Sequence, residues 1–178
     1  MLIVGVVGMV AGFGVFSAFS ATTTNAGNEF ASGSVRIEDN ATVGAKLFSN
    51  TSGLAPGAFE EHCLRVTYTG SLTASAVKLF SSTATNGADF QLKVERGTGV
   101  AWNCSDFAPT STVHDGDLGA FPSSFAGGYD GKSGAATWAT NDAVTYRFRI
   151  TVKDDNTANA HTTVKSTGPV AFTWEAHS

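Results

Sequence analysis

AVTYRFRITV, residues 143–152, carries the clearest strand pattern of the chain. Apolar and polar side chains alternate along it, and in an extended strand such an alternation places the two kinds on opposite faces. The apolar face holds Val144, Tyr146, Phe148, Ile150 and Val152, and the polar face holds Thr145, Arg147, Arg149 and Thr151. The stretch therefore predicts a half-buried β-strand with one face against a core.

The same period of two recurs in shorter stretches on both sides of this strand. Their apolar positions are Val35 and Ile37; Leu64, Val66 and Tyr68; Val77 and Leu79; Phe90, Leu92 and Val94; and Val170, Phe172 and Trp174. Turn signals separate them, at Pro56-Gly57, Thr69-Gly70-Ser71, Asn86-Gly87 and Asp154-Asp155-Asn156. We expect an all-β fold of seven or eight short strands, a β-sandwich or jelly roll in which the apolar faces bury one another.

The region from Phe107 to Asn141 lacks such a pattern. It is rich in Gly, Ser and Ala, with scattered aromatic residues, and it is too long for an ordinary connection between two strands. We expect it to form an excursion on the surface.

The composition agrees with strands joined by many turns. The 178 residues, a length that suits one domain, include 22 Thr, 17 Ser and 20 Gly, whereas charged residues make up only 15%. The net charge is −4. It argues against nucleic acid as a partner, because nucleic-acid-binding proteins present clustered Lys and Arg to the phosphates.

The N-terminal segment has the character of an export or membrane segment. Leu2 to Phe19 reads LIVGVVGMVAGFGVFSAF without an ionisable side chain. As a helix it would span about 27 Å, slightly less than the roughly 30 Å of a bilayer. We therefore expect a cleaved leader over residues 1–17, with Ser17, two residues after Val15, at a processing site that releases Ala18. Ala18-Phe19-Ser20 is a second candidate processing site. The positive charges that begin such a leader are absent, and the borderline length makes a retained anchor the alternative.

Residues 18–29 follow the leader and end at Glu29, the first charged residue of the chain. From Ala21 to Asn28 it reads ATTTNAGN, which is small, polar and without periodicity. We expect it to be extended or flexible rather than packed, and so able to pair elsewhere.

Cys63 and Cys104 are the two cysteines of the chain. An exported chain matures where thiols oxidise, so an even cysteine count predicts one disulfide between them. Two separate buried thiols are the alternative.

Catalytic and metal-binding motifs are missing from the sequence. His62, His114, His161 and His177 never recur at metal-ligand spacing, and no HExxH pair is present. We expect these histidines to be solvated at the surface, with a zinc site assembled from distant loops as the alternative. No Gly-x-Ser-x-Gly turn marks a serine nucleophile. The sequence therefore predicts a protein without a cofactor and without enzymatic activity.

Several features in a fixed order resemble the TasA/camelysin family. They are the Ala18-Phe19 pair after the hydrophobic segment, the Thr/Asn-rich stretch from Thr22 to Asn28, and the strand entry Phe30-Ala31-Ser32-Gly33-Ser34. The Pro-Gly turn, RVTYTGS, YRFRITVKDD and a terminal FTWEA follow. The resemblance covers most of the chain and is densest at its two ends.

This resemblance implies a secreted subunit of biofilm-matrix or cell-surface fibres with a jelly-roll domain, here residues 30–178. It also implies that the processed N-terminus pairs as an extra strand with a neighbouring copy; the donor positions would be Ala18, Phe19, Ser20, Ala21, Thr22, Thr23, Thr24 and Asn25. Such head-to-tail donation gives a homopolymer, because it does not close. Contact with a membrane is then expected only through the N-terminal segment before processing.

Two other functions stay open at this point. The family is also described as a metallopeptidase, but no residue of this chain can be carried over as a zinc ligand. A pilin-like or membrane-anchored protein would instead keep Met1 to Phe19 as a helix, in lipid or at the centre of a filament.

Overall fold

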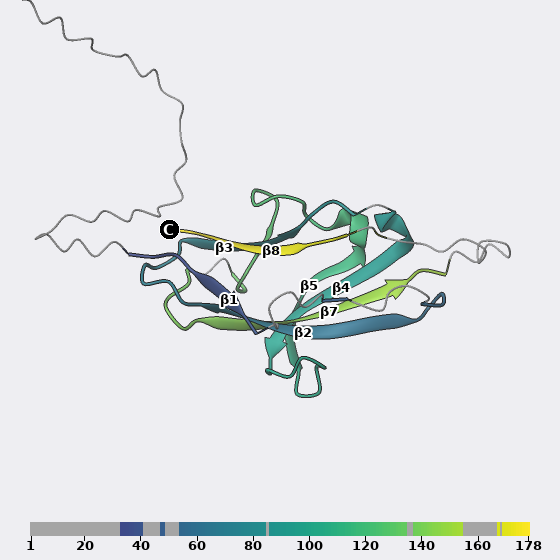
Figure 1. The fold of residues 1–178 in the computed structure, drawn as a ribbon, viewed down its shortest axis with the longest axis horizontal. Helices are drawn as coiled ribbons and strands as arrows, with labels where there is room; N and C mark the ends of the chain where they lie inside the picture. Colours follow the sequence, from purple (N-terminus) through teal and green to yellow (C-terminus); the bar gives the residue numbers. More distant parts are fainter. Residues whose placement is uncertain are drawn as a thin grey trace, which may run out of the picture. The chain divides into compact units, whose positions relative to one another are not determined.

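The computed structural model describes residues 33–40, 47–48, 54–84, 86–134, 137–154, 167 and 169–178. These residues form two antiparallel sheets, of five and three strands (Figure 1). The elements are β1 (Ile37–Asp39), β2 (Phe59–Tyr68), β3 (Ala76–Ser81), the 3-10 helix η1 (Gly87–Asp89), β4 (Phe90–Thr98), β5 (Ala108–Asp117), the 3-10 helix η2 (Leu118–Ala120), β6 (Tyr129–Asp130), β7 (Ala143–Val152) and β8 (Phe172–His177). The predicted β fold in two sheets is confirmed.

Strand β7, the AVTYRFRITV stretch, lies at the centre of the larger sheet. The strand order there is β1-β2-β7-β4-β5. Tyr146 and Phe148 are fully buried, while Arg147, between them, is half-buried on the opposite face. Both neighbouring strands are in register with this pattern, since Leu64 of β2 lies opposite Tyr146 and Val94 of β4 lies opposite Phe148. The alternation predicted from the sequence is therefore the alternation of the fold.

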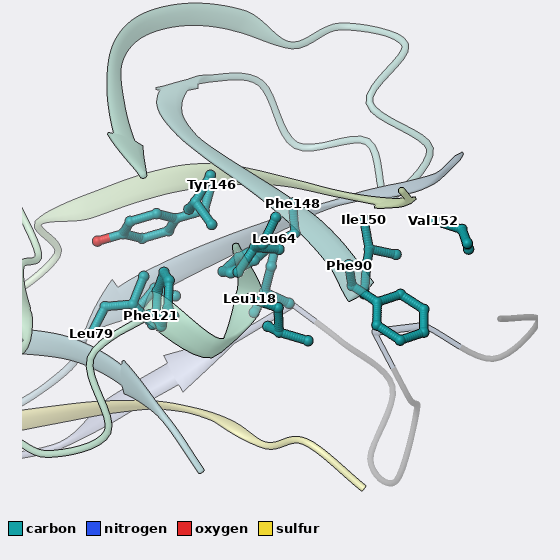
Figure 2. Packing of buried hydrophobic residues seen from close by; sticks show 12 residues of the cluster. Leu64, Leu79, Phe90, Leu118, Phe121, Tyr146, Phe148, Ile150 and Val152 are labelled. Atoms are coloured by element: carbon teal, nitrogen blue, oxygen red, sulfur yellow. The ribbon is translucent and has the colours of Figure 1, made fainter. Parts of the chain in front are cut away.

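The main core lies between the two sheets. Figure 2 shows its side chains, with Tyr146 and Phe148 of β7 facing Leu79 and Phe121. The whole buried cluster comprises Leu64, Val66, Leu79, Phe90, Leu92, Val94, Leu118, Phe121, Tyr146, Phe148, Ile150 and Val152. Removing such a contiguous set of apolar side chains from water is the dominant favourable term in folding.

The smaller sheet has the order β6-β3-β8. Its strand β8 contributes aromatic side chains to the space between the sheets. The Phe172 ring lies 4.8 Å from that of Phe148, and the Trp174 ring lies 5.4 Å from that of Tyr146, both measured between ring centroids. These contacts join β8 to the central strand of the other sheet.

A second, smaller cluster lies at one end of the domain. Buried Trp138 and Val77 pack there with Tyr68, whose hydroxyl donates a 2.5 Å hydrogen bond to the Leu72 carbonyl. A side chain at Gly70 would place its Cβ 2.4 Å from that hydroxyl. The Thr69-Gly70-Ser71 turn therefore needs glycine for close approach.

The region Phe107 to Asn141 is not the surface excursion that the sequence led us to expect. It contains the ten-residue strand β5, and it supplies Leu118, Phe121 and Trp138 to the two buried clusters. The prediction was wrong because β5 has no regular alternation, and because the apolar residues after it lie in short irregular segments that a period-two search does not detect.

One expected strand position differs from the structure, and two expected turns agree with it. Val35 is not buried: 39% of it is exposed, and β1 begins only at Ile37. The turns at Pro56-Gly57 and Asn86-Gly87 are present, with φ of 79° at Gly57 and 53° at Asn86, values that glycine and asparagine tolerate. Residues 155 and 156 lie outside the described residues.

Candidate functional site

The predicted processing and donor residues lie outside the described residues. This holds for Ser17 and for every donor position from Ala18 to Asn25. In the part of the chain that is described, no helix is long and apolar enough to cross a membrane.

Cys63 and Cys104 lie together, with 2.21 Å between their sulfurs and 5.1 Å between their Cα atoms. This geometry is compatible with the disulfide that the cysteine count predicts. Cys63 is on β2, and Cys104 is in the β4–β5 loop, residues 99–107, so the pair joins two segments 41 positions apart.

The histidines are less solvated than the sequence suggested. His114 on β5 is buried, with Nδ1 2.9 Å from the Tyr129 hydroxyl and Nε2 3.2 Å from the Asp117 carbonyl. His62 is half-buried and stacks on Trp102, with 4.9 Å between ring centroids. Within the described ranges, no three His, Cys, Asp or Glu side chains gather closely enough to hold a metal ion. The expectation of surface histidines was therefore wrong for His114.

The outer face of the larger sheet carries ion pairs rather than a binding cleft. Arg147 of β7 donates two hydrogen bonds to Glu95 of β4, at 2.9 and 2.5 Å. Lys93 approaches the same carboxylate at 3.4 Å. Burial acts to raise the pKa of Glu95, but the hydrogen bond and charge of Arg147, together with Lys93, hold it below its usual value. Opposite charges on neighbouring strands therefore offset one another on this face.

Among the described residues, strand β8 pairs along one side only, with β3. Its pairing with β3 runs without interruption over all six residues. At one end the Ala171 carbonyl accepts from the Ser82 N–H at 2.8 Å, and at the other the His177 carbonyl accepts from the Ser75 N–H at 2.7 Å. Ala171 and His177 therefore direct their backbone groups toward β3.

The alternate residues of β8 direct their backbone groups the other way. Because N–H and C=O directions alternate along an antiparallel strand, those of Phe172, Trp174 and Ala176 point away from β3. No strand of the described chain pairs with that side of β8. These three residues define what we call the β8 edge. In Figure 1, β8 lies along β3.

Three features that keep edge strands from pairing are missing from β8, although it carries the charged residue Glu175. Proline, glycine and register shifts, which protect edges in many sheets, are absent from its sequence FTWEAH and from its pairing. Its inward-facing rings, Phe172 and Trp174, remain partly exposed although they contact the core. An added strand beside β8 would gain both backbone hydrogen bonds and cover for these rings.

The other long edges are protected. Strand β5 carries Pro109, and its pairing with β4 shifts register after Val94 and again after Arg96. The edge of β2 is covered by β1 and, beyond it, by the β4–β5 loop, whose Trp102 carbonyl accepts the Cys63 N–H at 2.9 Å. The β8 edge is therefore the candidate functional site.

Sequence reasoning predicted the strand but not its free edge. The alternation of Phe172 and Trp174 marks β8, whereas the number of neighbours that a strand has depends on the order of strands in space. The fibre-protein resemblance read from the sequence stays a prediction, because neither a protein-family model nor a curated protein sequence matches this chain.

Proposed function

We propose that this protein is a structural, non-enzymatic subunit of extracellular fibres at the cell surface or in a biofilm matrix. In this proposal residues 18–28 of one copy form a strand that pairs with the β8 edge of the next copy. The observation that carries the proposal is the side of β8 that no described strand pairs with, with the partly exposed rings of Phe172 and Trp174 beside it.

Strand addition uses the chemistry that an open edge offers. Main-chain hydrogen bonds supply affinity to any extended segment, and pockets beside alternate side chains supply selectivity. Residues 18–28 suit this role, since Phe19 is their only large side chain and the rest are small or polar. A donated strand would extend the three-stranded sheet to four strands, and the two sheets would then complete a jelly roll.

The placement of the donor makes the assembly open-ended. A segment that leaves its own domain and pairs with another copy forms a head-to-tail contact, and such contacts generate filaments when they do not close. Processing after Ser17 would release this segment from the hydrophobic leader, so assembly would follow export. The partner is then a second copy of the same chain.

Deleting residues 18–27 tests this function. The truncated protein keeps every described strand, so we expect it to fold as a soluble monomer, whereas the processed full-length chain forms filaments in electron micrographs. A synthetic peptide of residues 18–29 should bind the truncated monomer one to one, and a scrambled peptide of the same composition should not.

A substitution at the β8 edge provides a matched control. Ala176→Pro removes an N–H that points away from β3, and therefore weakens pairing with a donor while leaving the bonds to β3 in place. We expect Ala176→Pro to fold but to polymerise poorly. Filaments of normal width from the truncated protein would show that residues 18–27 do not hold the fibre together.

A further inference from the structure

The β4–β5 loop takes an indirect route between two neighbouring strands. Instead of turning directly from β4 to β5, it crosses the outer face of β7. The Gly99 carbonyl accepts a 2.6 Å hydrogen bond from the Thr145 hydroxyl, and the Phe107 ring lies under the Arg147 guanidinium, 4.9 Å from ring centroid to Cζ. Thr145 and Arg147 both belong to β7, so the loop spans the central strand.

Beyond β7 the loop reaches the edge of β2. There the Trp102 carbonyl accepts the Cys63 N–H, and the Trp102 ring stacks on His62. Asn40, which follows β1, links the two segments, since its Nδ2 donates to the Val100 carbonyl at 3.1 Å and its Oδ1 accepts the Arg65 N–H at 2.8 Å. The loop and Asn40 thus contact the β2 edge at Cys63 and Arg65, next to the residues that β1 covers.

The loop has its own internal order. The Asp106 carboxylate accepts the N–H groups of Val100 and Ala101 at 2.9 and 3.0 Å, and these bonds lower the pKa of Asp106. Cys104, the residue joined to β2, has a φ of 59°, a conformation that non-glycine residues adopt at an energetic cost. Holding this residue in place therefore requires a strong tether.

The Cys63–Cys104 bond is the covalent tether. The other contacts between the loop and β2 are one backbone hydrogen bond, one ring stack and the Asn40 bridge. Each is weak in water and must offset the entropy lost when a nine-residue loop is fixed. The loop residues Asn103, Ser105 and Asp106 are exposed, so the solvent competes for these contacts.

We propose that the Cys63–Cys104 disulfide is a redox-operated cover for the β2 edge, and that its reduction uncovers a surface for pairing with β2 of a second copy. A small dithiol supplies the two electrons and two protons: its thiols form one disulfide while Cys63 and Cys104 become thiols. The Cys63 N–H then loses the Trp102 carbonyl and can bond to another chain.

Charge complementarity selects a second copy as the partner. In an antiparallel pair of β2 strands centred on Cys63, Glu61 of each strand lies opposite Arg65 of the other. Glu61 already pairs with Arg149 of β7 at 2.7 Å, so Arg65 of the second copy would join an existing ion pair from its other side. Arg65 is exposed and forms no ion pair with a described residue, so its charge is available. The pairing displaces Asn40 from Arg65 and gives a two-fold interface.

Amide hydrogen exchange tests the cover directly. Because loss of the disulfide lowers global stability and so accelerates all core amides, the readout is the ratio of two exchange rates. In the Cys63→Ser, Cys104→Ser variant we expect the rate at residue 63, relative to that of the Phe148 amide of β7, to be at least about tenfold higher than in the oxidised protein. In the oxidised Trp102→Ala variant residue 63 should stay protected, since the disulfide is intact. The same ratio of the residue 63 rate to the Phe148 rate in the serine variant and the oxidised protein overturns the proposal.

Association tests the uncovered surface. By light scattering, the serine variant should form dimers at concentrations where the oxidised protein forms none. The Cys63→Pro, Cys104→Ser variant should not, because proline removes the central N–H of the uncovered edge. Dimers of equal stability in the proline variant place the contact elsewhere and contradict the proposal. All proteins compared by light scattering also carry Ala176→Pro, which weakens the proposed fibre contact at β8, so failure here leaves the proposed fibre function untouched.

Discussion

The indole of Trp174 packs edge-on against the ring of Phe148, with 5.9 Å between the ring centroids and 84° between the ring planes. Edge-to-face contacts of this kind are favourable because the positive edge of one ring meets the negative face of the other. The contact fixes β8 to the central strand through its side chain. The backbone of the same residue is left pointing outward, so β8 is anchored and available for pairing at the same time.

Trp174→Ala should destabilise the domain by about 3 kcal/mol, the lower end for loss of a large aromatic side chain, because Trp174 is only partly buried. Urea denaturation followed by circular dichroism measures the change. Thr173→Ala, at the exposed neighbouring position, is the control and should change stability by less than about 0.5 kcal/mol. Equal effects of the two substitutions would contradict the packing role of Trp174.

The Glu95–Arg147 ion pair should make the free energy of unfolding depend on pH. The pKa of Glu95 is lower in the folded chain than its usual value of 4.5, so the ionised carboxylate stabilises the fold above that pH. This contribution is lost as the pH falls through the folded-state pKa. The free energy of unfolding should therefore decline below about pH 4.5, and less steeply in Glu95→Gln.

Urea titrations between pH 7 and pH 3 measure this dependence. Glu175→Gln, whose carboxylate lies on the exposed side of β8 beside His177, is the matched control. If Glu95→Gln and the natural chain lose stability in parallel over this range, Glu95 does not carry the acid sensitivity.

The disulfide should be detectable chemically and should contribute to stability. Thiol labelling of the denatured, unreduced protein should find no free thiol. Replacing both cysteines by serine should lower the free energy of unfolding by roughly 3–4 kcal/mol, the chain-entropy value for closing a loop of about this length. Two reactive thiols per chain would rule out the Cys63–Cys104 bond.

Purified protein should leave a generic substrate such as casein intact. The sequence carries no HExxH pair, and the described residues hold no three-ligand metal group. Cleavage that survives purification, is lost with a chelator and returns with zinc would instead assign the chain a metallopeptidase function.

The sequence predicted a strand best where apolar and polar residues alternate in step with the buried and outer faces of the sheet. Strand β7 alternates along its whole length because one face is buried and the other is covered by ion pairs. The same logic identified β2, β3, β4 and β8. It missed β5, because an edge strand with a largely exposed backbone and the sequence APTSTVHDGD needs no regular alternation to pair with β4.

The candidate site was less accessible to sequence reasoning. The cysteine pair could be predicted because the sequence led us to expect export, and two cysteines leave one possible bond. Burial of His114 depends on Tyr129 and Asp117, which meet only after β5 and β6 are placed. Likewise, nothing in the local sequence FTWEAH indicates that one side of β8 pairs with no described strand. An open edge is a property of strand order, which is set by contacts distant in sequence.

The most direct test of the central claim is hydrogen exchange at the amides of Phe172, Trp174 and Ala176, compared between assembled fibres and the monomer lacking residues 18–27. If residues 18–28 of a neighbouring copy pair with β8, these amides should be strongly protected in the fibre and exchange at least about tenfold faster in the monomer. The amides of β7 should be protected in both states. Fibres in which Phe172, Trp174 and Ala176 exchange as fast as in the monomer would contradict strand addition at the β8 edge.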